Sequence, residues 1–318
     1  MLCNNATIIR KSKRARQDND SDDELSNYPF LSRKSPRLLI SNEDIKNIFV
    51  GTSGYSYPSW HRSGSFYPKG TRGKELEFYM EQFNSLELNY SFYRIPTQNN
   101  LIKWKEKADA VRPNFLFAIK VYKWFTHMKQ LNVDDAFKEK WDEFWTVYNV
   151  LGDNLGPLLF QFPSNVKYNP DTSVDKLRNL YAILSPHGKY AFEFRDSSWY
   201  CSQVYQLFRE FDWCLCRLNL NNETGWAGSL STGNWPPDYV VPYVYSCSWG
   251  VYLRYHGTTG QYEGCYGPEF LVGLVKEIEN YIREGKKIFI YFNNTDDAKP
   301  SSAIQDAKFI TDTLHLQI

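Results

Sequence analysis

The chain has 318 residues, 42% hydrophobic and 23% charged, so it can build a sizeable core, and wholesale disorder is excluded. Its formal net charge of +1 provides no global field to draw in nucleic acid, although a local basic patch remains compatible with that value. No apolar run reaches the roughly 18 residues that a membrane-spanning helix needs, and we expect no membrane partner.

The first 45 residues differ in composition from the rest of the chain. A basic cluster at residues 10–16 precedes an acidic cluster at 18–24, and a stretch rich in Ser, Asn and Pro follows. This composition predicts a disordered tail over residues 1–45. Without an apolar signal segment or metal-binding cysteine spacing, the chain is predicted to be cytoplasmic with reduced thiols. The basic cluster fits a nuclear import signal as well as a solvated arm.

Short apolar runs alternate with helical periodicity from residue 48 onward. The predicted strands lie at residues 48–50, 86–88, 115–119, 158–162, 190–194, 213–218, 251–255 and 288–292. Apolar residues spaced three and four apart predict helices over residues 76–83, 101–108, 137–148, 174–184, 204–211, 271–282 and 303–314. Residues 219–247 break this rhythm and predict a long irregular loop, a feature that often forms a rim or lid.

This alternation predicts the fold class. Strands that alternate with helices pair in parallel through crossover connections. Eight such units in roughly 270 residues predict one domain over residues 48–315, a single (β/α)₈ TIM-type barrel of the α/β class. An open doubly wound sheet is the alternative, but no strand is followed by a glycine-rich phosphate-binding motif.

Polar residues recur at the carboxyl ends of the predicted strands, where the active sites of such barrels lie. They are Ser53, Glu87, Asn89, Lys120, Gln161, Glu193, Arg195, Arg254, His256, Asn293 and Asn294. Polar groups within apolar strands are costly unless they are paired. Their recurrence at one end therefore predicts a ligand site, with mutually satisfied buried ion pairs, such as Glu193–Arg195 or Glu87–Arg254, as the alternative.

Several segments around these positions carry specific motifs. They are 51–60 (GTSGYSYPSW), 87–94 (ELNYSFYR), 156–163 (GPLLFQFP), 193–195 (EFR), 254–257 (RYHG) and 291–294 (YFNN). Together they resemble the YecE-like family, a domain of unknown function (DUF72), over about residues 48–315. The resemblance implies a TIM-type barrel and the position of its site. It implies no reaction, because the activity of that family is not established.

Four strand-end residues are candidates for catalysis. Glu193 is predicted to be a general base or nucleophile, Glu87 the second carboxylate of an acid–base pair, and His256 an acid–base group or ligand. Lys120 suits neutralisation of an anion or, if it is desolvated, formation of a Schiff base. These groups predict a hydrolase or lyase that acts on a phosphate- or carboxylate-bearing substrate at the mouth of the barrel.

Twelve further residues are predicted to bind the ligand. They are Ser53, Tyr57, Trp60, Asn89, Tyr93, His127, Gln161, Arg195, Trp199, Arg254, Asn293 and Asn294. Arginine suits anionic groups, and aromatic rings stack on bases or sugars. The alternative function is therefore a non-catalytic barrel that binds a ligand or single-stranded nucleic acid, although the near-neutral charge does not favour nucleic acid.

The sequence assigns no cofactor and no metal ligands. Glu87, His127, Glu193 and His256 are the residues that would supply ligands if a metal were bound. This set is poor in His and Asp compared with hydrolytic two-metal sites, so a metal site remains an alternative.

Overall fold

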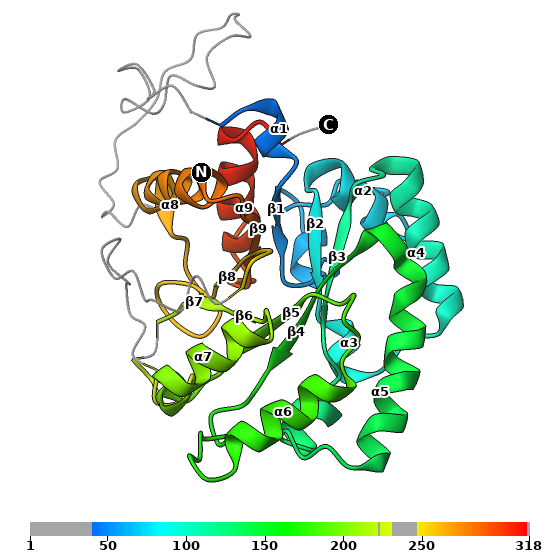
Figure 1. Cartoon of the computed structure of the whole chain (residues 1–318). Coiled ribbons are helices and arrows are strands. Elements are labelled where there is room, and N and C mark those ends of the chain that lie inside the picture. The colour runs from blue at the N-terminus through cyan, green and yellow to red at the C-terminus, as the bar shows by residue number, and fades with distance from the viewer. Residues whose placement is uncertain (1–39, 222, 231–246, 317–318) are drawn as a thin grey trace, which may run out of the picture.

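A computed structural model describes residues 40–221, 223–230 and 247–316 (Figure 1). Most of the predicted tail, its basic cluster at 10–16 and the larger part of the predicted loop at 219–247 lie outside these ranges. A short helix, α1 (Asn42–Ile45), lies at the end of the stretch predicted as the tail. The Ser41 hydroxyl accepts a hydrogen bond from the Asp44 amide, and the Asp44 carboxylate accepts one from the Ser41 amide.

The strands pair in parallel, as the strand–helix alternation predicts. They form two sheets. One sheet has the order β1 (Ile48–Thr52), β9 (Lys287–Phe292), β8 (Gly250–Tyr255), β7 (Arg217–Asn219). The other has the order β2 (Ser85–Leu88), β3 (Leu116–Lys120), β4 (Leu155–Gln161), β5 (Tyr190–Glu193), β6 (Cys214–Leu215). All eight predicted strands are present, with the sixth split into β6 and β7.

The sixth strand is split because its backbone changes partners at one residue. β6 pairs with β5, β7 pairs with β8, and the Cys216 amide between them donates to the Phe192 carbonyl at 2.8 Å. The described strands therefore form a four-stranded and a five-stranded parallel sheet and not one continuous closed sheet.

Side chains replace most of the backbone pairing between β1 and β2. One parallel bridge joins Ser53 to Glu87. Toward the amino ends of both strands, the side-chain amide of Asn84 accepts a hydrogen bond from the Val50 amide at 2.7 Å and donates one to the Ile48 carbonyl at 2.6 Å. Gly51 is required here, because a Cβ atom at this position would lie 2.0 Å from the Ser85 carbonyl oxygen. The first strands of the two sheets therefore approach closely where the polar residues begin.

Helices cover the outer faces of the sheets (Figure 1). The seven predicted helices are α2 (Glu75–Gln82), α4 (Gln98–Val111), α5 (Asp135–Tyr148), α6 (Ser173–Ile183), α7 (Ser202–Glu210), α8 (Gly267–Arg283) and α9 (Ser302–Thr313). The periodicity did not predict the short elements α3 (Tyr90–Tyr93), η1 (Pro58–His61), η2 (Trp124–Met128), η3 (Asn149–Asn154) and η4 (Ser197–Trp199). Within the described ranges, no helix is both long enough and apolar enough to cross a membrane.

Helix α5 illustrates how the aromatic content builds the core. Asp134 caps the helix by accepting from the Phe137 amide at 2.9 Å. Phe137, Trp141 and Phe144 are buried on one face, and the Trp141 ring stacks on Phe160 of β4 at 5.5 Å. Burying each such side chain contributes about 1.5–3 kcal/mol. Apolar packing of this kind fixes the strands, so their carboxyl ends can hold charged groups.

Candidate functional site

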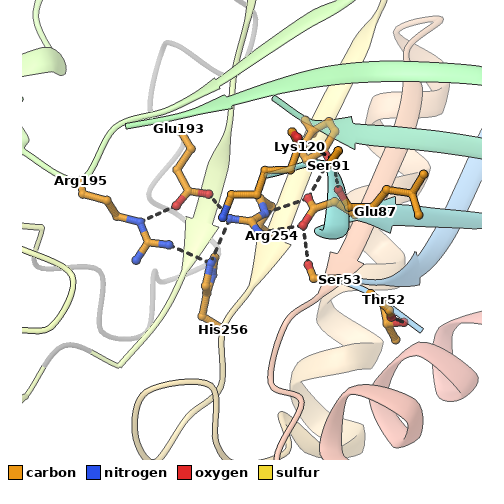
Figure 2. A network of polar contacts seen from close by, with 12 residues as sticks. Thr52, Ser53, Glu87, Ser91, Lys120, Glu193, Arg195, Arg254 and His256 are labelled. Carbon is orange, nitrogen blue, oxygen red and sulfur yellow. Dashed lines mark hydrogen bonds and ion pairs between the residues drawn. The ribbon is translucent and has the colours of Figure 1, made fainter. Parts of the chain in front are cut away.

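Arg254 on β8 is the centre of a buried charged cluster. Its side chain is 1% exposed, and its guanidinium lies between two carboxylates on strands of the other sheet (Figure 2). Nη2 and Nε donate to Oε1 and Oε2 of Glu87 at 2.8 and 2.9 Å, while Nη1 donates to Glu193. We call Glu87, Glu193, Arg195, Arg254 and His256 the Arg254 cluster.

The Glu87 carboxylate is fully occupied by donors. Besides the bidentate contact with Arg254, Oε1 accepts from the Ser53 hydroxyl at 2.6 Å and Oε2 from the Tyr252 hydroxyl at 2.7 Å. With four hydrogen bonds, both oxygens have used their lone pairs. Glu87 therefore holds Arg254 in place, and this geometry gives no support to its predicted acid–base role.

Glu193 is fully buried and faces two guanidinium groups. Burial alone would raise its pKa, but ion pairs with Arg195 and Arg254 hold the pKa well below its ordinary value. A carboxylate with so low a pKa is a weak base at neutral pH. The predicted role of Glu193 as a general base stays untested, and its contacts favour a role in positioning the two arginines.

His256 is a neutral member of the cluster. Its Nε2 lies 3.1 Å from Nη2 of Arg195 and 3.2 Å from Nη1 of Arg254. Guanidinium groups only donate, so Nε2 must accept and the ring proton must be on Nδ1. Burial and the two arginines also lower the pKa of His256 well below its ordinary value. Among the described residues, its buried Nδ1 has no hydrogen-bond partner, which leaves one donor available to a ligand.

Gly257 turns the chain sharply after His256. Its φ is +103°, and a Cβ atom would lie 2.0 Å from the Glu263 carbonyl oxygen, so only glycine fits. The returning loop brings the Tyr262 ring to 5.9 Å from the His256 ring, and Trp226 approaches it at 6.0 Å. The Trp226 ring also lies 5.0 Å from the Arg195 guanidinium. Aromatic rings thus cover the buried end of the cluster.

Lys120 at the end of β3 differs from the other cations of the site. No carboxylate of the described residues lies within ion-pair distance of its ammonium, which instead lies 4.3 Å above the Phe92 ring. Burial and repulsion from Arg254 lower the pKa of Lys120 to about 8, although Glu193 and Glu87 act in the opposite direction. The side chain remains partly exposed, so a ligand can reach it.

His127 lies close to Lys120, on the connection after β3. Its ring meets the Phe92 ring edge-on at 4.9 Å, and Nδ1 pairs with the Thr126 hydroxyl at 2.9 Å. Burial, followed by repulsion from Lys120 and Lys123, lowers its pKa to about 4. The imidazole is therefore neutral at physiological pH. It adds no positive charge next to the Lys120 ammonium.

The remaining predicted ligand residues fall into three groups. Arg195 belongs to the Arg254 cluster, Asn89 and Asn293 directly follow β2 and β9, and the Tyr57 hydroxyl donates to the Ser53 carbonyl. Gln161 and Asn294 have structural contacts: Gln161 donates to the Phe162 carbonyl, and Asn294 donates to the Gly264 carbonyl and to Asp306. Tyr93 is 66% exposed on α3, outside the Arg254 cluster.

Trp60 and Trp199 belong to the aromatic core. Trp60 is fully buried and packs on the Tyr57 ring at 4.9 Å. Trp199 stacks on Phe194 at 4.1 Å and donates from Nε1 to the Val166 carbonyl at 2.8 Å. Their positions lend no support to the prediction that they contact a ligand.

Sequence reasoning missed three residues that shape this end of the fold. Tyr252 donates to Glu87, Phe92 lies under Lys120, and buried Asp306 accepts from the Tyr266 amide and Asn294. Burial raises the pKa of Asp306 to about 7. The two-residue period of a strand would have placed Tyr252 on the same face as Arg254. Phe92 and Asp306 carry no such signal.

No set of metal ligands is apparent where the chain is described. Within residues 40–221, 223–230 and 247–316, no three His, Cys, Asp or Glu side chains converge as a metal-binding group. The guanidinium groups already occupy the carboxylates that would have been ligands. Five cysteines in these ranges are outside disulfides, namely Cys201, Cys214, Cys216, Cys247 and Cys265.

Comparison with known proteins confirms the resemblance seen in the sequence. The family model described as "Protein of unknown function DUF72" matches residues 49–317. The UPF0759 protein YunF of Bacillus subtilis (strain 168) is 26% identical over 273 residues, which cover 78% of this chain and 88% of YunF. The UPF0759 protein YecE of Escherichia coli (strain K12) is 27% identical over 118 residues, 37% of this chain and 38% of YecE.

Solved structures of the same family share the fold. A DUF72 family protein (TM1631) from Thermotoga maritima MSB8 aligns with a TM-score of 0.66 and 22% identity, covering 84% of this chain and 99% of that chain. A DUF72 family protein (EF0366) from Enterococcus faecalis V583 aligns with a TM-score of 0.66 and 20% identity, covering 85% and 96%. At these identities the likeness concerns the fold alone.

Proposed function

The chain belongs to the DUF72 family, whose description names no activity, and from its own residues we propose that it is a hydrolase or lyase acting on a small anion. The substrate would carry a phosphate or carboxylate group and would bind at the carboxyl ends of the strands. Neither the family description nor the names of the relatives identify a substrate.

The observation that carries this proposal is the unpaired charge of Lys120. Arg195, Arg254 and Lys120 oppose only two carboxylates, and both carboxylates are committed to the arginines. His256 is neutral and adds no charge. An anion bound beside this surplus cation would offset the free energy that its partial desolvation costs.

The other groups support anion binding in distinct ways. Arg195 is 7% exposed, so solvent reaches a small part of this residue. The buried Nδ1–H of His256 provides a neutral donor. Glu87 and Glu193 fix the arginines, which reduces the free energy needed to organise the site when the ligand binds. In this scheme the carboxylates position cations, and Lys120 contacts the substrate.

Anion affinity tests the proposal. We expect wild-type protein to bind inorganic phosphate or a small carboxylate in isothermal titration calorimetry and Lys120→Met to bind it 10- to 100-fold more weakly. One charge-assisted hydrogen bond contributes about 1.5–3 kcal/mol, which corresponds to that range. Lys123→Met removes a nearby lysine and provides the matched control. Equal affinities of wild type and Lys120→Met would refute the proposed site.

Turnover is tested separately on a panel of phosphate monoesters and hydroxy or keto acids. We expect Lys120→Met to lose activity with any substrate that the wild-type protein cleaves, while Lys123→Met retains it. If Lys120→Met cleaves every substrate at the wild-type rate, the catalytic half of the proposal fails.

We also propose that the two sheets together make the eight-unit (β/α)₈ barrel expected from the sequence. The Ser53–Glu87 bridge and the 2.8 Å hydrogen bond from the Gly54 amide to the Glu87 carbonyl support one junction. The single residue between β6 and β7 supports the other. A crystal structure in which β1 and β2, or β6 and β7, are separated would refute this closure.

A second candidate function is binding of single-stranded nucleic acid, and α3 supplies the observation that favours it. Tyr90 and Tyr93 are 39% and 66% exposed. The Arg94 guanidinium lies 4.6 Å from the Tyr90 ring and the Lys123 ammonium 5.7 Å from the Tyr93 ring. Exposed rings beside cations can stack on bases and neutralise phosphates. An oligonucleotide titration at low salt tests this, and no binding, or equal binding by Tyr93→Ala, would exclude it.

A further inference from the structure

We propose that Lys120 is a Schiff-base nucleophile and that the substrate is a small anion bearing an aldehyde or ketone. This inference rests on the proposed anion site and specifies its substrate class. It also favours the lyase over the hydrolase, because an imine promotes cleavage of a neighbouring carbon–carbon bond.

The contacts of the neighbouring carboxylates keep Lys120 free to react. A lysine near two glutamates would ordinarily form an ion pair, which stabilises the charged and unreactive ammonium. Here Glu87 accepts hydrogen bonds from Arg254, Ser53 and Tyr252. Glu193 accepts hydrogen bonds from Arg195 and Arg254. Both carboxylates thus form their hydrogen bonds with other groups. The Lys120 Nζ atom instead lies 4.3 Å from the centre of the Phe92 ring.

The electrostatic surroundings of Lys120 also favour the uncharged amine. Burial and the Arg254 guanidinium lower the pKa of Lys120 to about 8, as expected for a lysine desolvated next to another cation. At pH 8 about half of such lysines carry the free amine, against roughly 0.4% for a lysine with the ordinary pKa near 10.4. The reactive fraction is therefore raised on the order of 100-fold.

The reaction balances without an oxidant or reductant. The Nζ lone pair forms a bond to the carbonyl carbon, the carbonyl π electrons move to oxygen, and proton transfers give a neutral carbinolamine. Protonation of its hydroxyl then lets the C–O bond break, so that water leaves and a protonated imine remains. The net change is amine plus carbonyl plus one proton to iminium plus water. A carbon–carbon bond to the carbon next to the iminium carbon then breaks. Its electron pair forms the C=C bond of an enamine while the iminium π electrons move to nitrogen, and the other fragment leaves as CO₂ from a carboxylate or as a carbonyl compound from an alcohol that loses its proton. Protonation of the enamine carbon and addition of water to the resulting iminium release the product and return the free amine.

Borohydride trapping of the full-length protein tests the inference. Glyoxylate is the probe, because it combines an aldehyde with a carboxylate, and acetaldehyde is the control that lacks the anion. Sodium borohydride converts an imine with glyoxylate into a carboxymethyl-lysine, which peptide mass spectrometry locates. We expect Lys120 to be modified at least tenfold faster than Lys123, with a half-maximal rate near pH 8. We also expect phosphate to compete with glyoxylate.

Two measurements, borohydride trapping and phosphate binding, separate this inference from the proposed function. Lys120→Arg has no primary amine, so we expect no borohydride-trapped adduct at position 120, and phosphate affinity is compared between wild type and Lys120→Met. If wild type binds phosphate through Lys120 but glyoxylate modifies only other lysines, the Schiff-base inference is overturned and the anion site stands. If Lys120→Met binds phosphate as wild type does, the anion site itself is wrong, whatever residue is labelled.

Discussion

Replacing Lys120 by methionine should stabilise the protein while it weakens anion binding about 10- to 100-fold. The ammonium has no carboxylate partner among the described residues and lies on the Phe92 ring. Methionine has a similar length, carries no charge and contacts aromatic rings favourably. The variant therefore removes an uncompensated charge and keeps the packing.

The magnitude follows from the lowered pKa. A change from 10.5 to about 8 corresponds to about 3 kcal/mol, at 1.36 kcal/mol for each pKa unit. Since solvent reaches part of Lys120, we expect a gain of about 1–3 kcal/mol at pH 7. The unfolded chain binds this proton more tightly than the folded protein. The cost is therefore complete below about pH 8 and disappears as the pH rises toward 10.5.

Urea denaturation at pH 7 and pH 10 measures this effect. The free energy of unfolding of Lys120→Met should exceed that of wild type at pH 7, and the difference should shrink at pH 10. Lys123→Met, on the same connection after β3, should show no comparable dependence on pH. A variant less stable than wild type at both pH values would show that Lys120 is compensated in the folded protein and would refute the reasoning.

Three further predictions concern buried polar groups. Arg254→Met should lower the free energy of unfolding by about 3–5 kcal/mol in urea titrations, because Glu87 and Glu193 lose their shared partner; a loss below about 1 kcal/mol would contradict this. Tyr252→Phe should cost about 1–2 kcal/mol by the same measurement, since Glu87 loses one donor but keeps Arg254; no loss would show that this hydrogen bond contributes nothing. Burial raises the pKa of Asp306 to about 7, so wild-type stability relative to Asp306→Asn should fall by about 2–3 kcal/mol between pH 5 and pH 8; a difference independent of pH would refute the raised pKa.

The strand and helix positions could be predicted because apolar periodicity reports burial directly. Most residues of the predicted helix faces are buried, such as Phe137, Trp141, Phe144 and Tyr148 on α5, whereas Tyr181 on α6 is 47% exposed. The division of the sixth strand could not be predicted, because Trp213 to Leu218 reads as one apolar run. The change of pairing partner at Cys216 depends on how the preceding strand, β5, and the following strand, β8, lie on either side of it. The pairing of Asn84 with β1 likewise depends on two strands meeting.

The residue types of the site could be predicted from strand ends, but only part of their pairing could. Glu87, Glu193, Arg195, Arg254 and His256 do meet in one cluster, as alternating strand positions imply. The two ion pairs that the sequence offers as an alternative, Glu193–Arg195 and Glu87–Arg254, are both present, whereas the second ion pair of Arg254, with Glu193, could not be predicted because its partners come from different strands. The sequence favoured Glu193 as a base, whereas the structure surrounds Glu193 with guanidinium groups.

The distribution of paired charges changes which residues are the best candidates for chemistry. A carboxylate that is saturated by donors gains little by reacting, because every proton it accepts breaks an ion pair that stabilises the fold. Lys120 differs, because losing its proton removes a charge whose burial costs free energy. The neutral amine that remains has a free lone pair. Burial is the main cause of the lowered pKa of Lys120, and Arg254 adds to it by repelling the ammonium. Arg254 and Arg195 also form the ion pairs that occupy Glu87 and Glu193, so the Arg254 cluster and Lys120 belong to one electrostatic arrangement, in which the lysine has no carboxylate partner among the described residues.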